Sequence, residues 1–156
     1  MDTGKSRTTN IAISHCPLKL THAAFIKIKV KTPVFTVLPI FGPIGSFIAT
    51  IDLGEQKAIQ SISLGCLQNY RDWIFLPQSV SFEVSTDGLH FTLLQVISNL
   101  ISVNETKPLL HDFTAQFPVQ QVKWIRVSAK NIGVCPKGHN GEGQPAWLFA
   151  DEMVVK

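Results

Sequence analysis

Residues 79–85 alternate between polar and apolar side chains at every step, and this pattern strongly restricts how the chain can fold. In an extended segment, Val80, Phe82 and Val84 point to one face, and the serines and the glutamate around them point to the other. Asp87-Gly88 follows, a pair that supplies the positive φ angles of a tight hairpin turn. The segment therefore predicts a β-hairpin with one face in a hydrophobic core.

Similar alternation along the chain predicts further short strands. They are expected at residues 47–53, 62–64, 124–129 and 147–155. Residues 100–118 are expected to form a connection that contains one short strand near residues 109–113. Helical periodicity is absent over any window of useful length, and turn residues separate the strands. The sequence therefore predicts a β-sandwich or jelly roll.

Composition favours a single compact domain. The chain has 156 residues, of which 45% are hydrophobic and 16% charged, as is typical of a globular protein with a sizeable core. The net charge of +3 is small and spread along the chain, so it gives little reason to expect binding to nucleic acid or to an anionic membrane. Lys27, Lys29 and Lys31 alternate with apolar residues and are predicted to line the solvent face of a strand.

An uncharged segment at residues 32–50 is long enough to raise the alternative of a transmembrane helix. Pro33, Pro39 and Pro43, together with two glycines, divide it into pieces too short to span a bilayer. Buried strands and turns are therefore expected there. Residues 1–10 are polar and do not form a signal-peptide pattern, as is also expected of a domain taken from a larger exported protein.

The sequence contains no recognisable catalytic constellation. Asp151-Glu152 is the one adjacent pair of carboxylates, and neighbouring residues of a strand point to opposite faces, so the two cannot act on one atom. Nucleophile elbows, phosphate-binding glycine loops and zinc-protease motifs are missing. A structural role for Asp151-Glu152 near the end of the chain is the preferred interpretation, and no enzymatic activity is expected.

The three cysteines do not indicate a disulfide scaffold, because an odd number permits at most one bridge in a monomer. Cys66 and Cys135 are predicted to be ordinary buried thiols. His15-Cys16 could in principle bind zinc together with Cys135 and His139, but the spacings match no recurring zinc pattern. No metal site is predicted.

Two loops carry the side chains expected at a sugar-binding site. An aromatic ring can cover the C–H face of a pyranose, while amide, guanidinium and carboxylate groups pair with its hydroxyls. The first loop offers these groups within five consecutive residues, and the second can add two more. The candidate ligand-binding residues are Asn69, Tyr70, Arg71, Trp73, His139 and Asn140.

The alternative for the first loop is purely structural. Trp73-Ile74-Phe75 would then cap the core of the sandwich, and Arg71 and Asp72 would form a surface ion pair of little energetic value. Trp124 and Trp147 are predicted to be packing residues.

Several motifs taken together resemble the discoidin-type, or coagulation factor 5/8 type C, domain. The resemblance covers residues 51–155, while residues 1–46 are atypical. The motifs are Ile51-Asp52-Leu53-Gly54, Ser61-Ile62-Ser63, Leu67-Gln68-Asn69, Trp73-Ile74-Phe75-Leu76-Pro77, Ala129-Lys130-Asn131-Ile132-Gly133, Cys135-Pro136 and Ala146-Trp147-Leu148-Phe149. They are most similar to the C-terminal domain of chitobiase-like family 20 β-N-acetylhexosaminidases of gut Bacteroidetes.

This resemblance implies a galactose-binding-like jelly roll of about eight antiparallel strands. It also implies a non-catalytic carbohydrate-binding module, monomeric and without membrane insertion, that belongs to an exported enzyme of the periplasm or cell surface. The expected partners are glycans containing N-acetylhexosamine or galactose, and the parent catalytic domain. The alternative is a structural domain that docks on the parent enzyme and binds no sugar.

The N-terminal part departs from the family pattern. Asn10-Ile11-Ala12 resembles the usual opening, but residues 17–46 lack the Asp-Gly turn and the Trp segment that generally follow. Many discoidin domains hold a structural calcium with that turn and a glutamate near the C-terminus. Glu152 matches the glutamate alone, and calcium needs six or more oxygen ligands, so a bound calcium is not expected.

Overall fold

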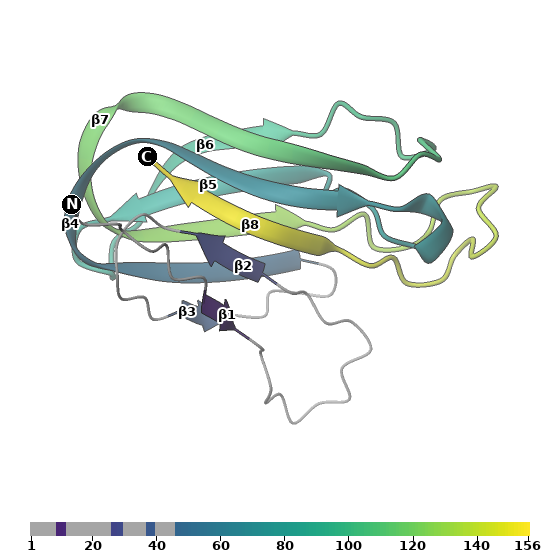
Figure 1. Cartoon of the computed structure of the whole chain (residues 1–156), viewed down its shortest axis with the longest axis horizontal. Coiled ribbons are helices and arrows are strands. Elements are labelled where there is room, and N and C mark those ends of the chain that lie inside the picture. Colours follow the sequence, from purple (N-terminus) through teal and green to yellow (C-terminus); the bar gives the residue numbers. More distant parts are fainter. Residues whose placement is uncertain (1–8, 12–25, 30–36, 40–45) are drawn as a thin grey trace, which may run out of the picture.

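The computed structural model describes residues 9–11, 26–29, 37–39 and 46–156 (Figure 1). For the first three segments and for residues 151–152 the description covers the backbone alone. Within these ranges the helical structure is a single 3₁₀ turn, η1 (Tyr70–Asp72), and no helix is long or apolar enough to cross a bilayer. The strands are β1 (Thr9–Ile11), β2 (Ile26–Lys29), β3 (Val37–Pro39), β4 (Ser46–Gln68), β5 (Ser79–Ser85), β6 (Thr92–Ser98), β7 (Leu109–Lys130) and β8 (Phe149–Val155).

The strands form one continuous sheet in the order β1-β2-β8-β4-β7-β5-β6, and β3 pairs with the beginning of β4. The predicted hairpin is present as β5 and β6, but its connection spans residues 86–91 and is not the tight Asp87-Gly88 turn that was predicted. Neighbours in the sheet are antiparallel, except that β2 runs parallel to β8, which departs from the expected all-antiparallel arrangement. Residues 26–29 form a strand, as predicted for the segment that contains Lys27 and Lys29, while Lys31 lies outside the described residues.

β4 and β7 convert this sheet into a two-layered sandwich, because each passes through both layers (Figure 1). The first part of β4 pairs with residues 124–130 of β7, and its last part pairs with residues 109–116. Between them the register shifts twice, and such bulges bend and twist a strand. Both strands arch over at the left of Figure 1, so the predicted β-sandwich is confirmed.

Three sequence-based boundaries are wrong. The separate strands predicted at residues 47–53 and 62–64 are both part of β4. Gly54, with φ 79°, lies where β4 bends, and the strand continues through it instead of ending in a turn. Residues 109–118 are not a connection with one short strand but the first half of β7. The last strand begins at Phe149 rather than Trp147, which instead makes an isolated bridge to Ile74.

The main core lies between the two layers and contains the inward-facing residues of β4, β5, β7 and β8. A smaller cluster of Phe75, Cys135 and Ala146 lies beneath the loops at one end and is covered in part by Tyr70 and Trp73. The largest fully buried side chains of the main core include Phe82, Phe113, Ile51, Leu53, Ile62, Leu64, Ile125 and Met153.

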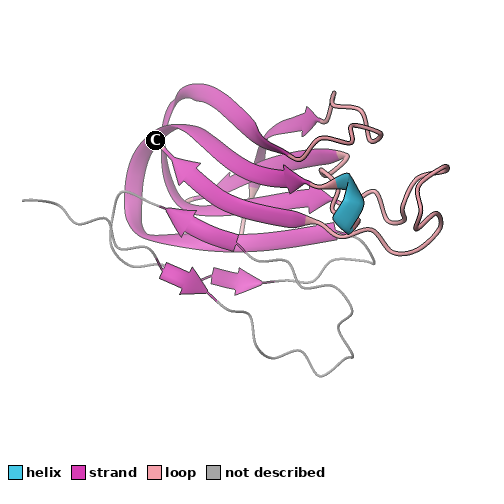
Figure 2. Cartoon of the chain, turned by 45° about the vertical axis from the view of Figure 1, so that its right-hand side comes forward, coloured by secondary structure: helices cyan, strands magenta, loops and turns pink. Residues whose placement is uncertain are grey.

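The two ends of the sandwich differ. The bends of β4 and β7, the β5–β6 turn and the C-terminus lie at one end (Figure 1). Residues 69–78, 99–108 and 131–148 form the connections at the opposite end, which we call the loop end (Figure 2). His15, Cys16 and most of residues 17–46, for which the sequence made specific predictions, lie outside the described residues.

Candidate functional site

The first loop of the loop end is a tight turn built around η1. Asn69 and Ile74 exchange two backbone hydrogen bonds, with N···O distances of 2.9 and 3.1 Å, which close the loop at its base. Trp73 ends η1 in the left-handed region at φ 63°, a conformation that is uncommon for a residue with a side chain. The Asn69 amide donates a hydrogen bond of 2.6 Å to the Asp72 carboxylate across the turn.

The second loop, residues 131–148, is fixed by its own backbone. Cys135 N–H donates to the Gln144 carbonyl at 2.8 Å, and Gly143 N–H donates to the Cys135 carbonyl at 3.1 Å. The Asn131 side chain adds a bond of 2.9 Å to the Ala146 carbonyl. The loop is therefore held in one conformation although it contains no regular strand or helix.

His139 joins the two loops. Its Nδ1 accepts a hydrogen bond of 2.9 Å from Gly141 N–H, so the ring proton resides on Nε2. Nε2 lies 2.7 Å from the carbonyl oxygen of Tyr70 and donates to it. The imidazole also contacts the rings of Tyr70, Trp73 and Phe75 edge-on, with centroid distances of 4.3, 6.2 and 5.5 Å. The two loops predicted to cooperate therefore meet at the same end.

Trp73 and Gly141 make a second junction between the loops. A Cβ atom built on Gly141 would lie 2.7 Å from Cε2 of Trp73, so only glycine allows the indole to lie against this backbone. Beside it, Trp147 N–H donates to the Trp73 carbonyl at 2.9 Å, and Phe75 N–H donates to the Trp147 carbonyl at 3.0 Å.

Gln68 connects a third loop to the same region. Its side chain is 1% exposed, and its Nε2 donates to the carbonyls of Ser102 and Glu105 at 3.2 and 3.1 Å. Its Oε1 accepts from Leu76 N–H at 3.3 Å. Sequence reasoning did not identify this role. A signal was present, because Gln68 continues the inward-facing series of Ile62, Leu64 and Cys66 along β4.

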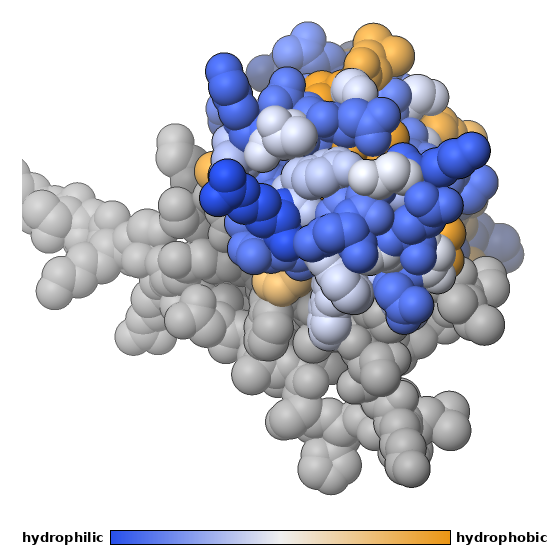
Figure 3. Space-filling model, turned by 90° about the vertical axis from the view of Figure 1, so that its right-hand side faces the viewer, coloured by the Kyte–Doolittle hydropathy of each residue, from blue (hydrophilic) through white to orange (hydrophobic). Residues whose placement is uncertain are grey.

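The candidate ligand-binding residues differ in accessibility. Arg71 and Asn140 are exposed, while Asn69, Tyr70 and Trp73 are half-buried. His139 is only 4% exposed, and both of its ring nitrogens already have backbone partners. It therefore does not offer the direct contact that the sequence suggested, and its contribution is to position the loops. Figure 3 shows the loop end as a largely hydrophilic surface.

The structural interpretation of the first loop holds in part. Ile74 and Phe75 are buried and cap the sandwich, as predicted. The expected Arg71–Asp72 ion pair is not formed, and Oδ2 of the Asp72 carboxylate instead accepts a hydrogen bond from the Asn69 amide. Trp124, predicted to be a packing residue, is half-buried and lies against the backbone of Gly88.

Cys66 and Cys135 are free, buried thiols, as predicted. Burial, with a smaller contribution from the Asp112 carboxylate, raises the pKa of the Cys66 thiol to about 12. Burial also raises the pKa of Cys135. Both stay protonated at neutral pH and are unsuited to nucleophilic attack or metal ligation. Within residues 46–150 and 153–156, where side chains are described, no three His, Cys, Asp or Glu residues gather as a metal site.

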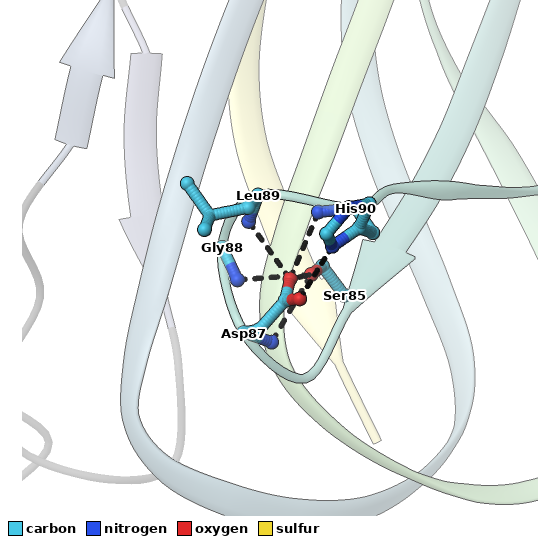
Figure 4. A network of polar contacts seen from close by, with 5 residues as sticks. All are labelled: Ser85, Asp87, Gly88, Leu89 and His90. Carbon is cyan, nitrogen blue, oxygen red and sulfur yellow. Dashed lines mark hydrogen bonds and ion pairs between the residues drawn. The ribbon is translucent and has the colours of Figure 1, made fainter.

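A second polar cluster lies at the opposite end, in the β5–β6 turn (Figure 4). Ser85 Oγ donates to Asp87 Oδ1 at 2.8 Å, and Asp87 Oδ2 pairs with His90 Nδ1 at 2.7 Å. Nucleophilic catalysis requires the serine hydroxyl to contact the imidazole, whereas here the carboxylate separates them. Since Asp87 also accepts from the backbone N–H groups of Leu89 and His90, the cluster stabilises the turn.

No family model matches the sequence, and no curated protein matches it. Similar solved structures include a mutant of chitosan-binding module 1 of a chitosanase/glucanase from Paenibacillus sp. IK-5, with 13% identity and a TM-score of 0.49, covering 77% of this chain and 74% of that one. Another is a CBM32 module from Clostridium perfringens in complex with GalNAc-β-1,3-galactose (16% identity, TM-score 0.42, 77% and 67% coverage).

A third is the C-terminal domain of a chitobiase from Bacteroides fragilis, with 19% identity and a TM-score of 0.39, covering 71% of this chain and 62% of that one. All three TM-scores lie below 0.5, and the sandwich itself is defined by this chain's own strand pairing and core.

Proposed function

We propose that this chain is a non-catalytic carbohydrate-binding module and that the loop end is its binding surface. The observation that carries the proposal is the 2.7 Å bond between His139 and Tyr70, because it makes one surface from two loops far apart in sequence. Loops fixed on a rigid sandwich are where binding residues concentrate.

The chemistry of this surface suits a sugar. Exposed Arg71 and Asn140 present a guanidinium and an amide to ring hydroxyls, and Asn69, in the same loop as Arg71, has its amide oriented by Asp72. Half-buried Tyr70 and Trp73 offer ring surface to the C–H face of a pyranose. His139 positions both loops and does not contact the glycan.

The ligands proposed are glycans that contain N-acetylhexosamine or galactose. A shallow site of this kind buries little of a sugar, so a single module binds weakly. Weak binding suits an accessory role, in which the module keeps glycan near a catalytic domain of the same protein. We place it in an exported β-N-acetylhexosaminidase-like hydrolase of the periplasm or cell surface, in line with the sequence resemblance.

Docking of the first loop on a parent enzyme without sugar binding is less well supported. Such docking needs an exposed apolar patch at Trp73 and Phe75. Phe75 is fully buried beneath the loops, and Trp73 is half-buried against Gly141, with Arg71 and Asp72 exposed next to it.

A glycan array with the wild-type chain and the variants Arg71→Ala and Asn140→Ala tests the proposal. We expect binding to oligosaccharides with terminal N-acetylglucosamine or galactose, and about tenfold weaker binding for each variant, since each loses a hydrogen bond to the ligand. Lys156→Ala removes a positive charge at the opposite end and is the control, with unchanged binding expected. Equal binding by all four proteins, or none by the wild type, would contradict the proposal.

A further inference from the structure

Within the part of the chain that the structure describes, β6 is an edge strand with no strand on its outer side. It is the last strand in the sheet order and pairs only with β5 among the described residues. One row of its backbone N–H and C=O groups therefore has no strand partner in this part of the chain. Such an edge is a template for pairing with another strand, and proteins generally protect it with charges, proline or bulges.

The sequence of β6 carries little of this protection. Residues 91–104 contain no charged residue and no proline. Leu93 and Val96 lie opposite Glu83 and Ser81 of β5 and are 55% and 53% exposed, and Leu100 just beyond the strand is 94% exposed. The one protective feature is a register shift between Phe82 and Glu83, which leaves a bulge before Gln95.

A second edge, in the first half of β7, differs from β6 in its protection. Residues 109–120 of β7 pair with β4 on one side only, and β5 pairs with β7 from residue 124 onward. This edge contains His111, Asp112 and Pro118, and hence both charge and proline. It also has exposed apolar side chains, Leu110 and Val119. Exposed apolar residues therefore occur at both of these edges, but of the two the β6 edge is the one without charge and proline.

We propose that β6 pairs antiparallel with β6 of a second copy of this chain and forms a homodimer, in place of the monomer expected from the sequence. A twofold axis through the middle of the strand places β6 of one copy opposite β6 of the other in reverse order. The side chains of β6 must therefore be able to pair with one another. Thr92 and Ser98 are polar at its two ends, Gln95 is central, and apolar residues fill the positions between. Opposed apolar and amide side chains attract across such a pair.

Charge also favours a second copy at this edge. Each copy carries a net charge of +3, so two copies repel each other weakly, and a contact between charged surfaces can add like-charge pairs to this repulsion. β6 and the residues that follow it bring none, because the stretch is uncharged to Asn104. Antiparallel pairing points the two loop ends in opposite directions, so a dimer presents two separate binding ends.

Sedimentation of the full chain from about 1 µM to about 300 µM, a range suited to a small interface, tests the proposal. We expect a reversible monomer–dimer equilibrium. Val96→Lys places two lysines close together across the twofold axis and should raise the dimer dissociation constant at least about tenfold. Val134→Lys is the matched control, since Val134 is 51% exposed but lies in the loop of residues 131–148, and its dissociation constant should equal that of the wild type.

A second measurement needs no variant. Hydrogen exchange of the β6 amides should slow as the protein concentration rises, while exchange in residues 109–120 stays constant. A wild-type chain that remains monomeric throughout, an open-ended aggregate, equal dissociation constants for the two lysine variants, or β6 exchange independent of concentration would each overturn the proposal. None of these outcomes depends on whether the loop end binds sugar.

Discussion

The imidazole Nε2 of His139 donates a 2.7 Å hydrogen bond to the carbonyl oxygen of Tyr70, a residue 69 positions earlier in the chain. Because Nδ1 of the same ring accepts from Gly141 N–H, the neutral imidazole connects both loops through backbone groups alone. The loop end therefore depends on a buried histidine that no ligand can reach. The exposed side chains of Arg71 and Asn140, one in each loop, remain free to bind a ligand.

Replacing His139 should loosen both loops. His139→Ala removes two hydrogen bonds and leaves the Tyr70 carbonyl and Gly141 N–H without this partner, so we expect the free energy of unfolding to fall by about 2–4 kcal/mol. Urea denaturation measures this change. His139→Gln keeps one donor and one acceptor and should recover part of the loss. Identical stability of the alanine variant and the wild type would show that the junction is unimportant.

Gly141→Ala should displace Trp73. The added Cβ would lie 2.7 Å from the indole Cε2, so the ring must move and the two loops separate. We expect a blue or red shift of tryptophan fluorescence together with at least about tenfold weaker glycan binding. Gly138→Ala is the control, because its Cβ meets nothing within 4 Å and only the strain of its φ of 84° is added. Matching spectra for the two variants would argue against this packing.

Gln68→Leu should destabilise the chain although it adds apolar volume to the interior. The carbonyls of Ser102 and Glu105 lose their donor and Leu76 N–H its acceptor, which costs about 2–4 kcal/mol of unfolding free energy. Thermal and urea unfolding measure the loss. The exposed Gln116→Leu serves for comparison and should change stability by less than about 0.5 kcal/mol. Equal stability of the two variants would rule out a role for the buried amide.

The β5–β6 turn should contribute to stability only over a limited pH range. Hydrogen bonding to Asp87 raises the pKa of His90 above 6.5, so this contribution is complete below that value and is lost as pH rises through the raised pKa. Hydrogen bonds from His90 and Leu89 hold the pKa of Asp87 well below 3.8, so its contribution is present above 3.8 and is lost as pH falls through the lowered pKa.

The melting temperatures of the wild type and His90→Ala, measured across pH, test the direction of this pH dependence. The difference should be largest between pH 3.8 and 6.5, shrink as pH rises through the raised pKa of His90, and diminish in high salt, because both side chains are exposed. A difference that grew steadily with pH would contradict the assignment.

Local chemistry made the hairpin and the core predictable. The alternation in residues 79–85 specifies β5, since its determinants lie within the strand itself. The tight Asp87-Gly88 turn was predicted wrongly, because the connection spans residues 86–91 and of the pair only Gly88 has a positive φ. The long strands were not predictable in this way. Gly54 and Pro118 resemble strand ends locally, but in the folded chain both lie near the register shifts where β4 and β7 bend between layers.

The candidate site, like the fold, could be predicted from the sequence only in part. Residue types suggested Arg71 and Asn140, which are exposed, but they could not show that His139 is buried. That outcome depends on a contact between segments 69 residues apart, and sequence spacing carries no information about it. Gln68 could have been found from its place in the inward-facing series of β4.

An ¹H–¹⁵N NMR titration with N-acetylglucosamine and with galactose, each to about 20 mM, tests the central claim most directly, because a shallow site binds single sugars weakly. The account predicts dose-dependent shifts of the backbone amides of Tyr70 and Arg71, of the Trp73 indole and of the Asn140 side-chain amide. Asp87 and His90, at the opposite end, should not move. Resonances of the loop end that stay fixed with both sugars, or shifts confined to the opposite end, would contradict it.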